Sequence, residues 1–271
     1  MGWRNIPASD TQITHGDRLW LYAVAAIIML LLVVPTLIVI PMSFSDSQYL
    51  EFPPETWSVR WYNEYFESAK WMRATVTSLQ IGVLTMLLAT PLGTMAAYAL
   101  FVSGHQAARA VFMFLLTPII VPVILIAIGT FYAYGRLGLN NSITGLVLAH
   151  TALATPLVMI VITAALRTYD LNQERVARSL GATRVKAFFV ITLPQIRFSV
   201  MTAALLSFLT SFDEVIIAIF VSGGVNATLT KHMFSALRDF IDPTIAAIST
   251  IMILVSTLLL LATQFLGSRE K

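Results

Sequence analysis

The stretch ERVARSLGATRVKAFFVITLP, residues 174–194, is the most densely basic part of the chain, yet it lies between two long apolar segments. It carries Gly181 near its middle and ends on Leu193 and Pro194. Proline fits the first turn of a helix, so we expect Pro194 to open the apolar segment that follows. A basic stretch between apolar ones is typical of a cytoplasmic loop that joins two membrane-spanning helices.

The residues around Gly181 predict the local structure of this loop. Asp170 and Gln173 have the spacing of a helix N-cap and its reciprocal partner, which predicts a short helix from 171 to about 180. Gly181 is placed to end it, because glycine adopts the left-handed conformation without steric cost. A second helical segment is expected over 183–192. Charge alone leaves two interpretations open, a topological anchor and a docking element.

The composition indicates an integral membrane protein. Of the 271 residues, 57% are hydrophobic and only 11% are charged, whereas soluble domains carry about 25% charged residues. The net charge is only +3, so the basic residues indicate cytoplasmic loops and not a nucleic-acid surface. The absence of cysteine excludes disulfides and thiolate metal sites, and no metal site is expected.

Six apolar segments approach the ~20 residues that a helix needs to cross a membrane. Because lipid cannot satisfy backbone polar groups, all six are expected to be helices. They cover residues 19–40, 77–102, 110–134, 144–166, 196–221 and 244–266. Kinks are expected at the prolines inside them, which are Pro35, Pro91, Pro118, Pro122 and Pro156. The sequence thus predicts an all-α membrane protein, with a cytoplasmic tail over 1–18 and one six-helix domain over 19–271.

Orientation follows from the basic residues, because cytoplasmic loops carry the excess of Lys and Arg. With the N-terminus inside, the cytoplasm receives Arg4, Arg18, Arg109, Arg167, Arg175, Arg178, Arg184, Lys186, Arg197, Arg269 and Lys271. The other side receives the smaller group of Arg60, Lys70, Arg73, Arg136, Lys231 and Arg238. Both termini are therefore expected in the cytoplasm.

The basic loop resembles a family motif. Glu174, Ala177, Gly181, Ile191, Leu193 and Pro194 are similar to the "EAA---G---------I-LP" loop of ABC importer permeases. The resemblance implies that residues 167–195 form a coupling loop that docks on a cytoplasmic ATPase. The residues expected to carry this coupling are Glu174, Ala177, Gly181, Ala182, Ile191, Leu193 and Pro194. The usual Glu-Ala-Ala triplet is displaced here, since Glu174 stands one place early and is followed by Arg175 and Val176.

Other stretches extend the resemblance. WSVRWYNEYFES (57–68), SFDEVIIAIFVSGG (211–224) and DPTIAAISTIMI (242–253) are similar to the second permease subunit of polyamine (spermidine/putrescine) importers. This implies the six-helix fold of ABC type I importer permeases in a bacterial inner membrane. It also implies a second permease as a heterodimer partner, two copies of an ATPase that holds ATP and Mg, and an external solute-binding protein. No cofactor is expected on this chain.

Motifs of catalysis are absent from the sequence. No lysine follows a glycine, so the chain lacks the G-x-x-x-x-G-K-[ST] loop that wraps nucleotide phosphates. It also lacks H-E-x-x-H and G-x-S-x-G. The chain is therefore expected to have no catalytic residue and to be driven by another subunit.

Asp213 and Glu214 are the only acidic pair inside an expected span. Charge at that depth usually faces protein or water, so one of the two is a candidate to guide a cationic solute along a path, and a hydrated structural pair is the alternative. His150 is a third path candidate, with a packed, hydrogen-bonded histidine as its alternative.

The sequence thus predicts a permease subunit that forms half of the path for a small organic solute, with a polyamine as the expected substrate. Related permeases often carry an acidic residue where this chain has Val123, so import of an amino acid derivative or an opine remains an alternative. A secondary transporter is a further alternative, against which stands the absence of an inverted repeat.

Overall fold

The computed structural model describes residues 14–267, and no strand occurs among them. The basic residues Arg4, Arg269 and Lys271 and most of the expected tail over 1–18 lie outside the described residues. The longer helices are α1 (Leu19–Met42), α3 (Ala69–Ser103), α6 (Val123–Leu137), α7 (Ile143–Thr168), α11 (Arg197–Phe212), α13 (Leu229–Asp239) and α14 (Thr244–Gly267). The shorter ones are α2 (Arg60–Glu67), α4 (Ala108–Leu115), α5 (Thr117–Ile120), α8 (Asn172–Ser179), α9 (Arg184–Ala187), α10 (Leu193–Gln195) and α12 (Ile216–Val221).

The chain divides into two compact units. The first comprises residues up to Tyr65 together with Ile241–Ile251, and contains α1 and most of α2. After α1 the chain folds back on itself, because Ser43 Oγ lies 2.7 Å from Tyr62 Oη and Trp61 Nε1 donates to the carbonyl of Ser47 at 3.1 Å. These bonds hold the loop between α1 and α2.

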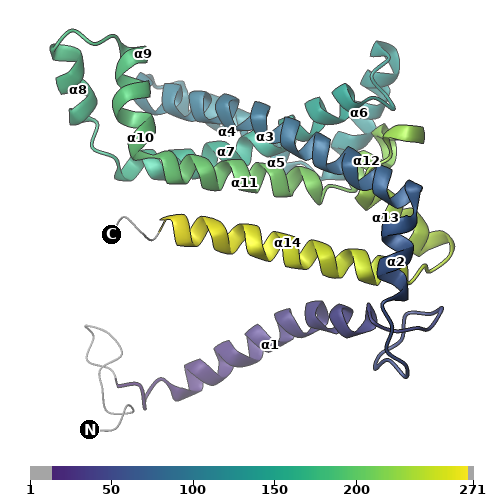
Figure 1. The fold of residues 1–271 in the computed structure, drawn as a ribbon. Helices are drawn as coiled ribbons and strands as arrows, with labels where there is room; N and C mark the ends of the chain where they lie inside the picture. Colours follow the sequence, from purple (N-terminus) through teal and green to yellow (C-terminus); the bar gives the residue numbers. More distant parts are fainter. Residues whose placement is uncertain (1–13, 268–271) are drawn as a thin grey trace. The chain divides into compact units, whose positions relative to one another are not determined.

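The second unit comprises Phe66–Phe240 and the chain from Met252 onwards, and its centre is formed by α3, α7 and α11. The three helices lie side by side in Figure 1. A Cβ added at Gly93 of α3 would lie only 2.7 Å from Val158 Cβ of α7, so this glycine permits the close approach of two helices that small residues favour in membranes. In Figure 1, α8 and α9 lie at one end of this bundle and α12 and α13 at the opposite end.

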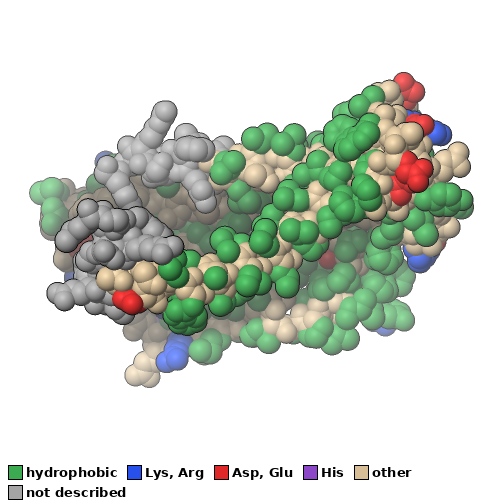
Figure 2. Space-filling model, turned by 90° about the horizontal axis from the view of Figure 1, so that it is seen from below, with side chains coloured by type: hydrophobic (Ala, Val, Ile, Leu, Met, Phe, Trp, Pro, Cys, Tyr) green, Lys and Arg blue, Asp and Glu red, His purple; other side chains and the backbone are tan. Residues whose placement is uncertain are grey.

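Among the residues that the structure describes, four helices are long and apolar enough to cross a membrane, namely α1, α3, α7 and Thr244–Leu261 of α14. A fifth span results if Arg184–Gln195 and Arg197–Phe212, which meet at a bend of 80°, count as one. Figure 2 shows hydrophobic side chains along the helices of the visible face and charged groups mostly towards its ends. This distribution fits helices that pass through a hydrocarbon layer.

Two of the six expected spans are not the continuous helices that the sequence predicts. The segment over 110–134 is divided among α4, α5 and α6. Pro118 and Pro122 lack a backbone N–H, so each removes one hydrogen bond that a continuous helix would need. Val121 is extended before Pro122, as the residue before a proline prefers. The segment over 196–221 is likewise divided, between α11 and α12 at residues 213–215. By contrast, Pro35, Pro91 and Pro156 lie inside unbroken helices.

Candidate functional site

The basic loop folds as helix, turn and second helical segment. Helix α8 ends at Ser179, and Gly181 follows in the left-handed conformation with a φ of +95°. Helix α9 begins after Thr183, whose hydroxyl accepts a bond from the N–H of Lys186 at 3.2 Å. A π-helical turn over Phe188–Thr192 continues it to α10, which contains Pro194. The expected helix and its glycine terminator are confirmed.

The expected capping pair at the start of this helix is wrong in detail. Asp170 Oδ1 accepts from the N–H of Asn172 at 2.9 Å, but the N-cap position is occupied by Leu171. The side chain of Gln173 does not turn back to Asp170, and instead accepts a hydrogen bond from Gln195 Nε2. A contact with a residue far along the chain replaces the local one. Pro194 also does not begin the long helix, because α10 is separated from α11 by the 80° bend.

Glu174 is buried within the chain, with only 4% of its surface exposed. Its Oε1 accepts a hydrogen bond from the hydroxyl of Tyr98 at 2.7 Å, and its Oε2 accepts one from Thr192 Oγ1 at 3.0 Å. The ring of Tyr98 packs on Phe188, with 4.5 Å between centroids. We call Glu174, Tyr98 and Thr192 the latch. It ties α8 to the C-terminal part of α3 and to the segment that leads into α11.

Three apolar side chains are exposed on the outer face of this basic loop. Val176, Leu180 and Val185 are all strongly exposed, and Leu180 shows 83% of its surface. They stand among Arg175, Arg178, Arg184 and Lys186, which are exposed as well. We call Val176, Leu180 and Val185 the coupling surface. Exposed apolar side chains rimmed by charge are typical of a protein-binding surface.

The remaining motif residues support this arrangement from inside. Ala177, Ala182, Ile191 and Leu193 are half-buried, and Leu193 packs against the core formed by α3 and α7. Pro194 is exposed. The loop therefore has an inner side, which is fixed to the bundle, and an outer side, which is available to a partner.

Glu214 lies at the break between α11 and α12 and caps the shorter helix. Its carboxylate accepts bonds from the N–H groups of Ile216, Ile217 and Ala218 at 2.9, 3.0 and 3.1 Å. At the other end of α12, Lys231 Nζ donates to the carbonyls of Ile219 and Ser222. A negative group at the N-terminus and a positive one at the C-terminus both stabilise a helix. Burial lowers the pKa of this ammonium from its ordinary value.

Asp213 and Glu214 both line a cavity of about 610 Å³ between α11 and α14, together with Thr210, Phe212 and Ser256. Asp213 is exposed, whereas only 8% of the Glu214 side chain is exposed. The carboxylate of Asp213 has no hydrogen-bond or ion-pair partner within residues 14–267. Of the two acids, Asp213 is thus the more exposed one and the one whose carboxylate is unpaired.

His150 lies in the interior, where 1% of its side chain is exposed. Its Nδ1 is 2.8 Å from Ser211 Oγ, and that hydroxyl donates in turn to Thr85 Oγ1 at 3.3 Å. Its Nε2 is 3.7 Å from Glu214 Oε2. The histidine links α3, α7 and α11, and it is not among the residues that line the cavity at Asp213.

With this geometry in view, comparison with known proteins identifies the family. Residues 89–271 match the family described as "Binding-protein-dependent transport system inner membrane component". The chain belongs to this family. The permease is 34% identical over 227 residues to the putrescine transport system permease protein PotI of Escherichia coli K12, covering 81% of this chain and 80% of the relative. It is 29% identical over 240 residues to the spermidine/putrescine permease PotC of Haemophilus influenzae, covering 88% and 93%.

Solved structures show the same fold. A bacterial ABC transporter involved in import of the acidic polysaccharide alginate has a chain with a TM-score of 0.73 at 16% identity, covering 94% of this chain and 97% of its own. The same kind of transporter in complex with a periplasmic protein gives 0.64 at 18% identity, covering 93% and 98%. The fold is that of ABC type I importer permeases, and the protein is a permease subunit of an ABC importer.

Sequence reasoning missed two parts of the site. Tyr98 and Thr192 carry no signal of their own, because a buried hydroxyl is recognised only once its partner is located. The coupling surface did have a signal, since Val176, Leu180 and Val185 are isolated apolar residues in a basic stretch.

Proposed function

We propose that the permease forms half of the translocation path of an ATP-driven polyamine importer in a bacterial inner membrane. A second permease supplies the other half, and two copies of a cytoplasmic ATPase drive the cycle. The relatives PotI and PotC are named for the transport of two polyamines, putrescine and spermidine. The observation on this chain that supports a cationic solute is the unpaired Asp213 carboxylate in its cavity.

The coupling surface is the docking site for the ATPase in this proposal. Movement of the ATPase would displace α8, and the latch would pass this displacement to α3 and α11, because Glu174 bonds to Tyr98 and Thr192. ATP and Mg belong to the ATPase, and this chain binds no cofactor. With both termini in the cytoplasm, the loop faces the ATPase and the opposite end faces an external solute-binding protein.

Gly181→Arg tests the docking role. The position has a positive φ and open space around its Cβ, so an arginine would both strain the backbone by about 1 kcal/mol and project from the loop. We expect a folded membrane subunit that no longer supports transport and binds the ATPase more weakly in a pull-down assay. Gly104→Arg is the matched control, because Gly104 also has a positive φ, of +60°, and open space, but lies outside the loop. Equal docking by the two variants would overturn the proposal.

The substrate is tested on the solute-binding protein encoded beside this permease. Calorimetric titration with spermidine, putrescine and a panel of amino acid derivatives should show tight binding of a polyamine. Binding of only a neutral or anionic solute would favour the alternative, import of an amino acid derivative or opine, and would remove the charge-based role of Asp213.

A further inference from the structure

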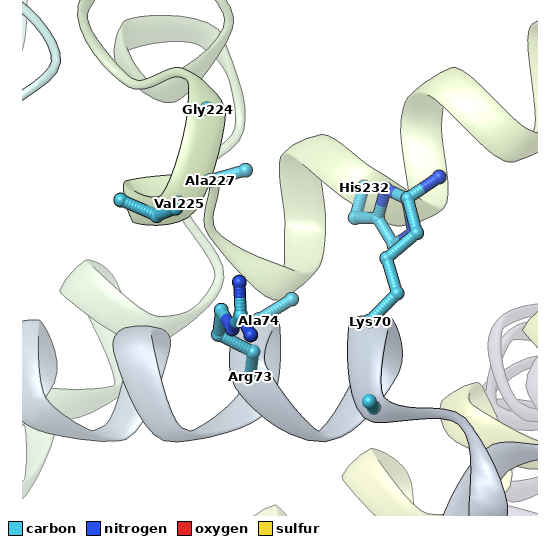
Figure 3. Close-up of a pocket in the computed structure, with 8 residues that line it drawn as sticks. Lys70, Arg73, Ala74, Gly224, Val225, Ala227 and His232 are labelled. Carbon is cyan, nitrogen blue, oxygen red and sulfur yellow. The ribbon is translucent and has the colours of Figure 1, made fainter.

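A second cavity, of about 310 Å³, lies between the first turns of α3 and the chain that enters α13. Figure 3 shows Lys70 and Arg73 on α3, with their side chains directed towards His232 and towards the loop at Val225. Part of its lining consists of the small side chains of Ala69, Ala74 and Ala227, which leave the space open. Three basic side chains therefore converge on one hollow.

The charges of Lys70 and Arg73 are not neutralised by any other residue that the structure describes. Lys70 and Arg73 have no hydrogen-bond or ion-pair partner among residues 14–267. Arg238 in the same unit differs, because it bonds to Asp239 at 2.8 Å. His232 is fixed against Trp71, with 4.3 Å between the ring centroids. Two permanent positive charges one turn apart thus face a cavity without a counter-ion.

The position of Lys70 on α3 is unfavourable for the helix itself. The N-terminus of a helix carries a partial positive charge, so a cation in its first turn destabilises the helix. Lys70 lies in the first turn of α3, which has no acidic residue, and Arg73 follows at the start of the second turn. Helix stability therefore does not explain Lys70, whereas an anion bound between the two side chains would offset both charges.

We propose that Lys70, Arg73 and His232 form a pocket that receives a carboxylate side chain of the external solute-binding protein when that protein docks. This inference rests on the proposed function, which places the pocket on the external side. A carboxylate on the docking face of that protein would be complementary in sign to this pocket, as charged groups across specific interfaces are. The guanidinium of Arg73 offers the planar fork that matches a carboxylate, and the exposed Val225 adds apolar contact at the rim.

The test measures docking of the purified, polyamine-loaded binding protein to the complete importer in nanodiscs of phosphatidylcholine. Lys70→Gln and Arg73→Gln are made singly and together. Arg136→Gln is the matched control, because Arg136 is an exposed cation in the last turn of α6 on the same proposed side and outside the pocket. Size-exclusion chromatography first establishes that each variant assembles with its companion subunits.

We expect the double variant to dock about tenfold more weakly, which corresponds to up to ~1 kcal/mol for each exposed charge pair. The control should stay within about twofold of wild type, and the difference should shrink at high salt because exposed charges are screened. Equal docking by the double variant and the control would overturn the pocket. So would a double variant that docks normally but loses binding of phosphatidylglycerol in native mass spectrometry, since the anion would then be a lipid phosphate. Failure of the wild-type importer to bind the loaded protein would instead overturn the proposed function.

Discussion

The two ends of the second unit each carry an acid that the sequence assigns to function and the structure turns inward. At one end, Glu174 is enclosed by two hydroxyls from distant parts of the chain. At the other, Glu214 is enclosed by three backbone N–H groups of the helix that follows it. In both places a residue of the same segment, Leu180 in the loop and Asp213 beside Glu214, remains exposed.

The difference between the ends lies in the range of these bonds. Glu174 joins three elements, so its removal would affect how motion passes from the loop to the bundle. The carboxylate of Glu214 accepts its hydrogen bonds from residues two to four positions ahead of it, and its one distant ion-pair contact is His150 Nε2 at 3.7 Å, so its removal would affect chiefly the local geometry of α12. Glu174 thus joins distant elements and Glu214 caps the helix that follows it, although both look alike in the sequence.

Glu174→Ala should have the largest effect. It removes two hydrogen bonds to the carboxylate, at a cost of about 3 kcal/mol, and leaves the Tyr98 hydroxyl buried without its acceptor, while the hydroxyl of Thr192 keeps Tyr169 Oη at 3.3 Å. We expect a lower unfolding temperature and ATP hydrolysis that no longer drives transport in reconstituted vesicles. Glu174→Gln is the control, because its amide oxygen still accepts the bond from Tyr98. A Glu174→Ala importer with wild-type stability and coupling would show that the latch is not needed.

Glu214→Ala should lower stability by about 1–2 kcal/mol, because three N–H groups at the start of α12 lose their cap. Glu214→Gln keeps one capping oxygen and should lose about half as much. Thermal unfolding of the purified subunit measures both. Transport by Glu214→Gln should remain close to wild type, and a loss as great as that caused by Asp213→Asn would contradict the structural role given to this carboxylate.

Leu180→Ser should weaken ATPase binding about tenfold without affecting stability. The side chain is 83% exposed, so its ~1.5 kcal/mol of apolar burial is gained only on docking. The measurement is the affinity of the purified ATPase for the permease complex. Leu137→Ser serves as control, because Leu137 is 68% exposed at the end of α6 and outside the coupling surface. Equal affinities of the two variants would place the ATPase elsewhere.

Asp213→Asn should have the smallest effect, a fall of about fivefold in the transport rate of spermidine. One charge pair in aqueous surroundings contributes ~1 kcal/mol, and the carboxylate has no partner within residues 14–267 to lose. Its unfolding temperature should therefore equal that of wild type. If both Asp213→Asn and Glu214→Gln transport spermidine normally, the acidic pair has no part in the path.

The sequence by itself determined four of the six expected spans as single long helices, and how the loop folds locally. Apolar length alone identified α1, α3, α7 and α14, because crossing a hydrocarbon layer is a demand on each helix separately. Gly181 correctly predicted the end of α8, because residues within one turn of a helix terminus determine where the helix ends. The Leu-Pro spacing of the loop carried the family resemblance that the comparisons confirm.

Only the tertiary structure decided which side chains of these segments turn inward. Glu174 reads as an exposed residue of a basic helix until Tyr98, 76 positions away, is packed against it. Pro118 and Pro122 stand at the breaks of their segment while Pro91 and Pro156 lie inside unbroken helices, although all four prolines stand in apolar segments. The physical reason is that a local pattern records the conformation of one or two turns, whereas burial and hydrogen bonding depend on elements far apart in the chain.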